Sequence, residues 1–393
     1  MKTKVTMTST ERRATLSLAS VFALRMLGMF IILPVFALYA AHLPGGDNKT
    51  LVGLAMGGYG LTQALLQIPL GWLSDRVGRK PVIMGGLVVF ALGSFVAATA
   101  HNIEWIIVGR MVQGAGAISS AIIAMTADLT RIEQRTKAMA LIGVTIGMTF
   151  SASMIIAPFL EPRIGVSGIF AMTGILALLA IGMVYWVTPN PQHHTPARGT
   201  WDAIKTVLGH AELLRLDWGI FVLHGSLMAM FVVVPQALVQ TGFKAMDHWK
   251  LYLPVMIGSF ILMIPGVALS HGKHRKSVFL AAIAVLLLSD VILWVGINSF
   301  FGIVTALFVF FTGFNMLEAS LPSFITTIAP PDIKGAASGV YSSIQFMGTF
   351  VGASVAGVLA RFYGPTSVPL FCVMLMVTWL VVALPMKIKA GHE

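Results

Sequence analysis

Four ionisable residues interrupt long apolar runs of this 393-residue chain: Arg25, His224, Asp290 and Glu318. An ionisable side chain inside such a run is costly unless it meets a partner or water, so it usually serves a function. Burial disfavours the charged form of a carboxylate, and imidazole changes its charge near neutral pH. We therefore expect proton binding and release here, with Glu318, which follows Asn315 in FNMLEASLP, as the leading proton carrier.

Each of these residues has a second interpretation. Glu318 can form a static ion pair with a buried arginine, and His224 can be held by hydrogen bonds alone. Asp290 can lie near the outer end of its run, where water reaches it. The sequence leaves these alternatives open, because it does not say which side chains face one another.

The turn GWLSDRVGRK, residues 71–80, concentrates charge between two apolar runs. Gly71 permits close packing of helix ends, and Gly78 permits a tight turn. Asp75 can meet the positive end of a facing helix or an arginine, and Arg79 can form a forked pair with a carboxylate. These features predict a structural contact at this turn.

A simpler interpretation is that the turn only sets the orientation of the chain in the membrane. Arg76 and Lys80, together with Arg79, supply the positive charge that such a role needs. It explains neither the acidic residue nor the two glycines, so we favour the structural contact.

The composition requires a membrane environment. Hydrophobic residues make up 57% of the chain and charged residues only 10%, which is too few to cover a soluble protein of this length. The formal net charge of +11 does not predict nucleic-acid binding, because the basic residues fall between apolar runs rather than on a soluble basic face. The apolar run that begins near residue 14 is too long for a signal peptide, so it predicts the first membrane span.

Twelve apolar runs approach the ~20 residues that a membrane span needs. Their approximate ranges are 15–40, 51–72, 81–100, 104–127, 138–160, 168–188, 215–240, 250–270, 277–297, 301–327, 336–360 and 366–386. With the N-terminus inside, nineteen of the 26 Lys and Arg residues fall in cytoplasmic segments and five in outer loops. This bias predicts that both termini are cytoplasmic.

The polar stretch 189–214 divides the spans into two groups of six, and its second part predicts a short helix at the membrane surface. LSDRVGRK at 73–80 and LSHGKHRK at 269–276 follow equivalent spans, which favours a duplication. The predicted domains are therefore 1–188 and 215–393, with 189–214 as the cytoplasmic linker. Glycines four residues apart in 53–57, 143–147 and 348–352 predict close contacts between helices.

No enzyme or cofactor motif is present in the sequence. HGKHRKS at 271–277 lacks the spacing of a phosphate-binding loop, and neither H-E-x-x-H nor G-x-S-x-G occurs. The single cysteine, Cys372, excludes an intramolecular disulfide and a cysteine-based metal cluster. We expect no enzymatic activity, no cofactor and no metal site.

The turn at 71–80 fills every defined position of G-x-L-[SA]-D-R-x-G-R-[KR], the signature between the second and third helices of the major facilitator superfamily. The chain resembles that family over nearly its whole length. The resemblance implies that this loop latches the two halves in the outward-open state, with Asp75 facing the start of the eleventh helix. Asp128, at the end of the fourth span, is implied to join this latch.

Two further motifs resemble proton-coupled members of the family. GRMVQGAGAI at 109–118 is similar to R-x-x-Q-G-x-G, which implies that Arg110, with Gln113, takes part in proton exchange. The alternative is that Arg110 extends to the outer interface. RMLGMFIILPVF at 25–36 resembles the first helix of drug:proton antiporters, whereas SMIIAPFLEP at 153–162 keeps Pro158 but lacks the glycines of their fifth-helix motif.

The resemblance implies an all-α membrane protein with twelve transmembrane helices in two six-helix bundles around a central cavity. The implied function is proton-coupled efflux of small amphipathic compounds by alternating access, in a bacterial-type inner membrane. The expected partners are a small-molecule substrate, protons and the lipid bilayer. Uptake or facilitated transport of a small metabolite or sugar, and a non-transporting membrane sensor, are the alternative functions.

Overall fold

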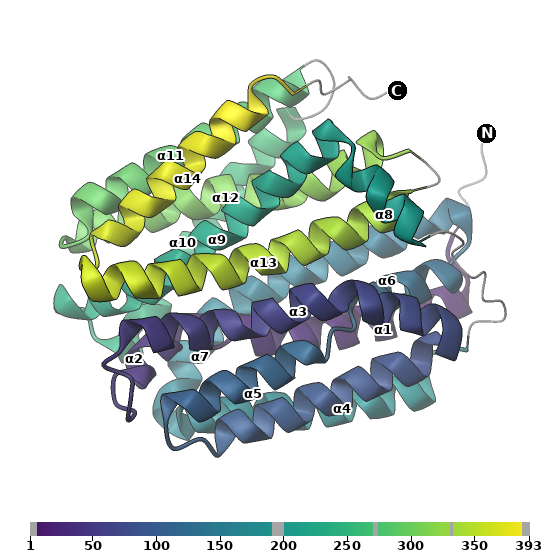
Figure 1. Ribbon diagram of the computed structural model, residues 1–393, viewed down its shortest axis with the longest axis horizontal. Coiled ribbons are helices and arrows are strands. Elements are labelled where there is room, and N and C mark those ends of the chain that lie inside the picture. Colours follow the sequence, from purple (N-terminus) through teal and green to yellow (C-terminus); the bar gives the residue numbers. More distant parts are fainter. Residues whose placement is uncertain (1–5, 191–199, 270–273, 331–332, 387–393) are drawn as a thin grey trace.

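The computed structural model describes residues 6–190, 200–269, 274–330 and 333–386, and within these ranges it contains helices and no strands (Figure 1). Ten helical runs in them are long and apolar enough to cross a membrane. One run, Glu133–Val187, covers two predicted spans, and a shorter apolar helix, Ser367–Ala383, follows the ten. The prediction of an all-α membrane protein is confirmed, and the helices are compatible with twelve spans.

The first six predicted spans are built from seven α-helices and one π-helical turn. These elements are α1 (Ser9–Phe30), α2 (Leu33–Ala40), α3 (Lys49–Val77), α4 (Arg79–Ala98), α5 (Ile103–Ala115), α6 (Ser119–Asp128), α7 (Ile132–Gly182) and η1 (Met183–Val187). We call this part of the chain the N-half.

The short helix α8 (Thr200–Leu208) lies where the sequence predicts a helix in the linker, and it is followed by the remaining spans. These are α9 (Ala211–Gln240), the 3-10 turn η2 (Ala245–Asp247), α10 (His248–Leu269), α11 (Arg275–Gly296), α12 (Phe300–Ile328), α13 (Lys334–Phe362) and α14 (Ser367–Ala383). We call the part from α9 to α14 the C-half.

Prolines and glycines set the irregularities of the spans. Pro34 has no N–H to donate to the previous turn, and the helix is interrupted just before it, between α1 and α2. The fourth span is interrupted at Gly116, where an added Cβ would collide with the carbonyl oxygen of Gly86 on α4. The fifth and sixth predicted spans follow each other directly, and one residue between them, Gly165 at φ +67°, breaks α7.

The two described chain ends lie at the same end of the molecule, together with α8 (Figure 1). We call this end the terminus side and the opposite end the far side. The turn at Gly78 and the starts of α1, α4 and α13 belong to the terminus side, whereas the starts of α3 and α12 belong to the far side.

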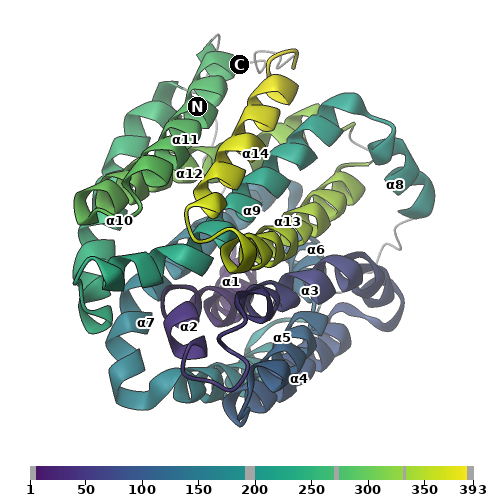
Figure 2. The same cartoon turned by 60° about the vertical axis from the view of Figure 1, so that its left-hand side comes forward.

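The two halves pack against each other on the far side. Helices α3 and α13 run side by side in both views (Figure 2). A Cβ added to Gly53 of α3 would collide with the carbonyl oxygen of Ala353 and would lie 3.0 Å from the Cα of Gly357, both on α13. Gln236 of α9 donates a 3.1 Å hydrogen bond to the carbonyl of Ala37 on α2. The close contact predicted for the 53–57 glycines is therefore present.

The packing differs on the terminus side. An added Cβ at Gly335 or Gly339, near the start of α13, would have no atom within 4 Å. The same holds for Gly143 and Gly147 on α7, so the contact predicted for this pair is wrong in this conformation. At these four glycines, therefore, no neighbouring helix among the described residues packs closely against the backbone.

Candidate functional site

Three helices of the C-half bring a histidine, a carboxylate and an amide together. His224 of α9 is 2% exposed, and its Nε2 lies 3.7 Å from Oε2 of Glu318 on α12. Gln345 of α13 has its Nε2 2.8 Å from the same nitrogen, and since an amide nitrogen only donates, His224 accepts here. The Glu318 side chain as a whole remains 25% exposed, whereas its Oε2 is buried and has no hydrogen-bond partner among the described residues. This arrangement places a carboxyl group beside an imidazole without a hydrogen bond between them.

The sequence prediction missed Asp217, which extends this group of residues toward the terminus side. Asp217 lies seven residues, or about two helical turns, before His224 on α9, so both are on the same face. It is 2% exposed, and neither carboxylate oxygen has a hydrogen-bond partner among the described residues. Tyr341 of α13 interacts electrostatically with both Asp217 and Glu318. Asp217 lies two residues after Arg215, at the start of the predicted span 215–240. A charge at this position is typical of a span end, so the sequence did not mark it as a buried residue.

Two other predicted residues of the C-half have different neighbours. Asn315 is buried and donates a 3.2 Å hydrogen bond to Ser259 of α10. Asp290 of α11 is 1% exposed and interacts electrostatically with Cys372 of α14. The structure therefore places Asp290 in the packing between α11 and α14, and its proximity to water at a span end is not observed.

The N-half buries two arginines around one aromatic ring. The guanidinium of Arg25 lies 5.8 Å, and that of Arg110 4.9 Å, from the ring centre of Tyr59. Arg25 also donates to Ser119 and Gln63, both of which are buried. No carboxylate pairs with either arginine in the part of the chain that the structure describes. The ring faces and neutral oxygens are what stabilise these two charges.

Gln113 fixes the position of Arg110. Arg110 donates hydrogen bonds to Oε1 of Gln113, at 2.9 Å, and to the carbonyl of Gly28, at 3.3 Å. Gln113 in turn donates a 2.7 Å hydrogen bond to Ser94. Arg110 is 0% exposed, so the alternative in which it extends to the outer interface is wrong. Neither arginine pairs with Glu318 among the described contacts, so the static ion pair considered for Glu318 is not formed.

The charged turn forms a cluster within the N-half. Buried Arg79 pairs with Asp75 and, at 3.1 Å, with Asp128 of α6, and its Nη1 donates 2.6 Å to Ser74. One guanidinium therefore ties together the end of α3, the start of α4 and the end of α6.

The two glycines of the turn have the expected local roles. An added Cβ on Gly71 would lie 2.9 Å from Oγ of Ser120 on α6, and Gly78 has φ +107°, which L side chains rarely adopt. The expected contact of Asp75 with the start of α13 is not found among the described residues, where Asp75 pairs with Arg79. Arg76 stacks 3.8 Å over the ring centre of Trp72, and it forms no ion pair with a described residue.

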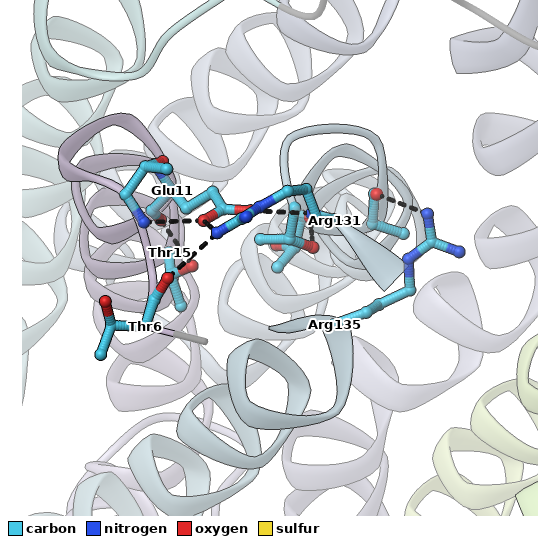
Figure 3. Close-up of polar contacts among 9 residues, drawn as sticks. Thr6, Glu11, Thr15, Arg131 and Arg135 are labelled. Atoms are coloured by element: carbon cyan, nitrogen blue, oxygen red, sulfur yellow. Dashed lines mark hydrogen bonds and ion pairs between the residues drawn. The ribbon is translucent and has the colours of Figure 1, made fainter. Parts of the chain in front are cut away.

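A second ion pair, also missed from the sequence, connects α1 to α7 (Figure 3). Buried Glu11 accepts hydrogen bonds from Arg131, at 2.9 Å from its backbone N–H, 2.8 Å from Nε and 2.9 Å from Nη2. Thr8 donates its N–H to the same carboxylate at 2.8 Å and caps the helix. The hydrogen bonds that the Arg131 side chain donates to the Glu11 carboxylate raise the pKa of Arg131. The Thr-x-x-Glu capping signature at 8–11 was the available signal for Glu11.

The comparisons with known proteins agree with this architecture. The Major Facilitator Superfamily profile matches residues 18–353. The chain is 43% identical over 385 residues to the inner membrane transport protein YajR of Escherichia coli (strain K12), covering 97% of this chain and 85% of that protein. It is 25% identical to the quinolone resistance protein NorA of Staphylococcus aureus (strain MSSA476), over 85% and 86% of the two chains. A bacterial homologue of the human lysosomal transporter Spinster, solved in an inward-facing and occupied conformation, superposes with a TM-score of 0.75 at 12% identity, over 96% and 97% of the chains.

Proposed function

The chain belongs to the major facilitator superfamily and is a membrane transporter rather than an enzyme, and we propose that it exports small amphipathic compounds in exchange for protons. The observation that carries this proposal is the 3.7 Å approach of Glu318 to His224 in a half that gives Glu318 no arginine or lysine partner among the described residues. A carboxyl group held in this way can gain and lose a proton without breaking a fixed ion pair.

The conformation supports an alternating-access cycle. With the terminus side assigned to the cytoplasm, as the positive-inside bias of the sequence predicts, the far-side contacts between the halves lie toward the outside, which supports an inward-facing state. The far-side contacts between α3 and α13 form the closed gate. In the opposite state this gate opens, and the terminus-side ends of the halves approach each other.

The proton biases this equilibrium through Glu318. A ligand shifts two states only as far as it binds them differently, so proton binding at Glu318 must differ between the inward-open and outward-open states. Asp217 and Tyr341 lie between this group and the terminus side, and they provide a route for the proton into the cytoplasm. The ionised and protonated forms of Glu318 thus belong to different steps of the cycle.

The cluster around Arg79 supports the second conformation. When the terminus-side ends meet, Asp75 can turn from Arg79 to the start of α13, while Asp128 continues to hold the guanidinium. The carboxylate then faces a helix N-terminus, which stabilises negative charge. The latch thus stabilises the outward-open state, and in the inward-open state its charges are satisfied within the N-half.

The descriptions of two relatives support the proposed type of substrate and the proposed membrane. NorA is described as a quinolone resistance protein and YajR as an inner membrane transport protein, which supports drug-like substrates and a bacterial inner membrane. Uptake or facilitated transport of a small metabolite or sugar is the alternative, and the direction of flux in vesicles distinguishes it from efflux. A non-transporting sensor is excluded once the purified protein moves any solute.

The test is proton movement in proteoliposomes under an imposed pH gradient. A fluoroquinolone and a panel of cationic and neutral amphipathic compounds are added to wild type, Glu318→Gln and Asp290→Asn. Asp290 is the matched control, because it is a buried C-half carboxylate outside the His224 group. We expect substrate-triggered proton flux in wild type and Asp290→Asn and none in Glu318→Gln. Flux that persists in Glu318→Gln contradicts the assignment of the carrier, and substrate movement without protons favours facilitated transport.

A further inference from the structure

A polar pocket opens on the terminus side of the N-half, away from the residues discussed above. It has a volume of about 490 Å³ and lies where the start of α1, the start of α4 and the end of η1 meet. Thr188 fixes one wall of the pocket, since its hydroxyl donates a 3.1 Å hydrogen bond to the hydroxyl of Ser17 on α1. The lining residues are Ser9, Thr10, Arg13, Lys80, Tyr185, Trp186, Thr188, Pro189 and Asn190.

The pocket contains two cations and no carboxylate among these lining residues. Arg13 donates a 3.0 Å hydrogen bond to the carbonyl of Trp186, and Lys80 donates a 3.5 Å hydrogen bond to the carbonyl of Tyr185. Lys80 and Arg13 are close enough to interact as like charges. The nearby acids are engaged elsewhere, Asp75 with Arg79 and Glu11 with Arg131. Two like charges held together by neutral carbonyls make a site for an anion.

An apolar surface leads from this pocket along the outside of the molecule. Ile175, Leu179 and Trp186 follow one another at four and seven residues on one helix face, and they are 52%, 64% and 75% exposed. Tyr185 packs edge-on against Trp186, with ring centres 5.7 Å apart, at the end of the span. Aromatic rings at this depth mark the level of lipid headgroups. The anion that fits this site therefore carries a long apolar part.

We propose that the pocket binds an acidic phospholipid from the leaflet on the terminus side. Its phosphate lies between Arg13 and Lys80, its headgroup hydroxyls meet Ser9 and Thr10, and an acyl chain follows the face formed by Ile175, Leu179 and Trp186. The start of α4 lacks a side-chain cap, so its N–H groups add to the positive potential at the phosphate. The bound lipid bridges three spans of the N-half.

The experiment is native mass spectrometry of the purified full-length protein in a lipid-free detergent. Dioleoylphosphatidylglycerol and dioleoylphosphatidylcholine are titrated separately, because their acyl chains are identical and only their headgroup charge differs. The pocket variant is Arg13→Gln with Lys80→Gln. The matched control is Arg12→Gln with Lys137→Gln, which removes two exposed terminus-side cations that do not line the pocket. Soluble glycerol 3-phosphate is added as a competitor to distinguish a lipid from a free phosphate ligand.

We expect the phosphatidylglycerol adduct to dominate and to weaken about 30-fold in the pocket variant, since each cation near an anionic lipid contributes roughly fivefold. The control variant should change by less than about threefold, and the soluble phosphate should not compete. If the double variant unfolds, Arg13→Gln alone should weaken binding about fivefold. Equal binding of the two lipids, equal loss in the control, or displacement by glycerol 3-phosphate each overturns the proposal.

Discussion

Arg361 donates a 2.9 Å hydrogen bond to Oδ1 of Asn48, and this bond joins the far-side ends of α13 and α3. Asn48 also caps α3, because its side chain accepts from the N–H of Thr50. The residue that begins the second span is therefore also a contact between the two halves. Beneath it, the glycines of α3 allow the backbones of both helices to meet.

Substitution of Gly53 by valine should open the far side. The atoms that a Cβ would meet belong to the backbone of α13, so the helices have to separate, and overpacking of this kind costs about 1–3 kcal/mol. The population should move toward the outward-open state. Labelling by a membrane-impermeant maleimide of a cysteine placed at Gln236, in a background with Cys372→Ser, measures this shift. Gly85→Val is the control, because an added Cβ there has no atom within 4 Å, and equal labelling of the two variants would contradict the prediction.

Substitution of Arg79 by lysine should impair transport although the charge is retained. A lysine cannot bridge Asp75 and Asp128 with a planar fork, so the ends of α3, α4 and α6 lose their common partner. We expect roughly a tenfold lower transport rate in vesicles. Arg76→Lys, whose side chain is exposed over Trp72, should transport normally. A normal rate in Arg79→Lys would show that charge alone is sufficient.

Substitution of Asp217 by asparagine should slow proton release toward the terminus side. The variant keeps the size of the side chain but cannot ionise. The acidic group on the His224 face of α9, between Glu318 and the terminus side, is therefore lost. We expect proton exchange after a pH jump to slow roughly tenfold or more, while substrate affinity stays unchanged. Asp290→Asn, which alters a carboxylate in the packing of α11 and α14, should leave the rate as in wild type. Equal slowing in both variants would argue against a path through Asp217.

Substitution of Glu11 by glutamine should lower thermal stability rather than transport specificity. The carboxylate accepts from both arms of Arg131 and from the caps of two helices, and an amide cannot accept all of these bonds. We expect the apparent melting temperature in detergent to fall by several degrees. Arg135→Gln removes a single hydrogen bond to the carbonyl of Ala127 and should have a smaller effect. The double variant Glu11→Gln with Arg131→Gln should melt close to Glu11→Gln alone, because both changes remove the same contact.

The sequence predicted the spans well because the apolar runs and the charged segments between them reflect the bilayer directly. It also predicted Gly78, since only a glycine tolerates the φ of +107° in that turn. It could not predict that Glu318 faces His224, because the two are 94 residues apart and no periodicity relates α9 to α12. Asp217 was missed for a related reason, since a charge two residues from Arg215 resembles a span end. Nor could it predict which glycines are in contact, since a Cβ added at Gly53 would collide with α13 whereas one at Gly143 has no atom within 4 Å.

The separation of buried charges between the halves gives the space between them an electrical polarity. Arg25 and Arg110 lie in the N-half without an acidic partner in the described ranges, whereas Asp217 and Glu318 lie in the C-half without an arginine or lysine partner there. In a medium of low dielectric constant such charges act over long distances. If the proposed exchange operates here, we expect a dipolar cargo between the halves to be turned with its negative end toward the N-half. We then expect protonation of Glu318 to weaken this field and to relax the alignment of the cargo.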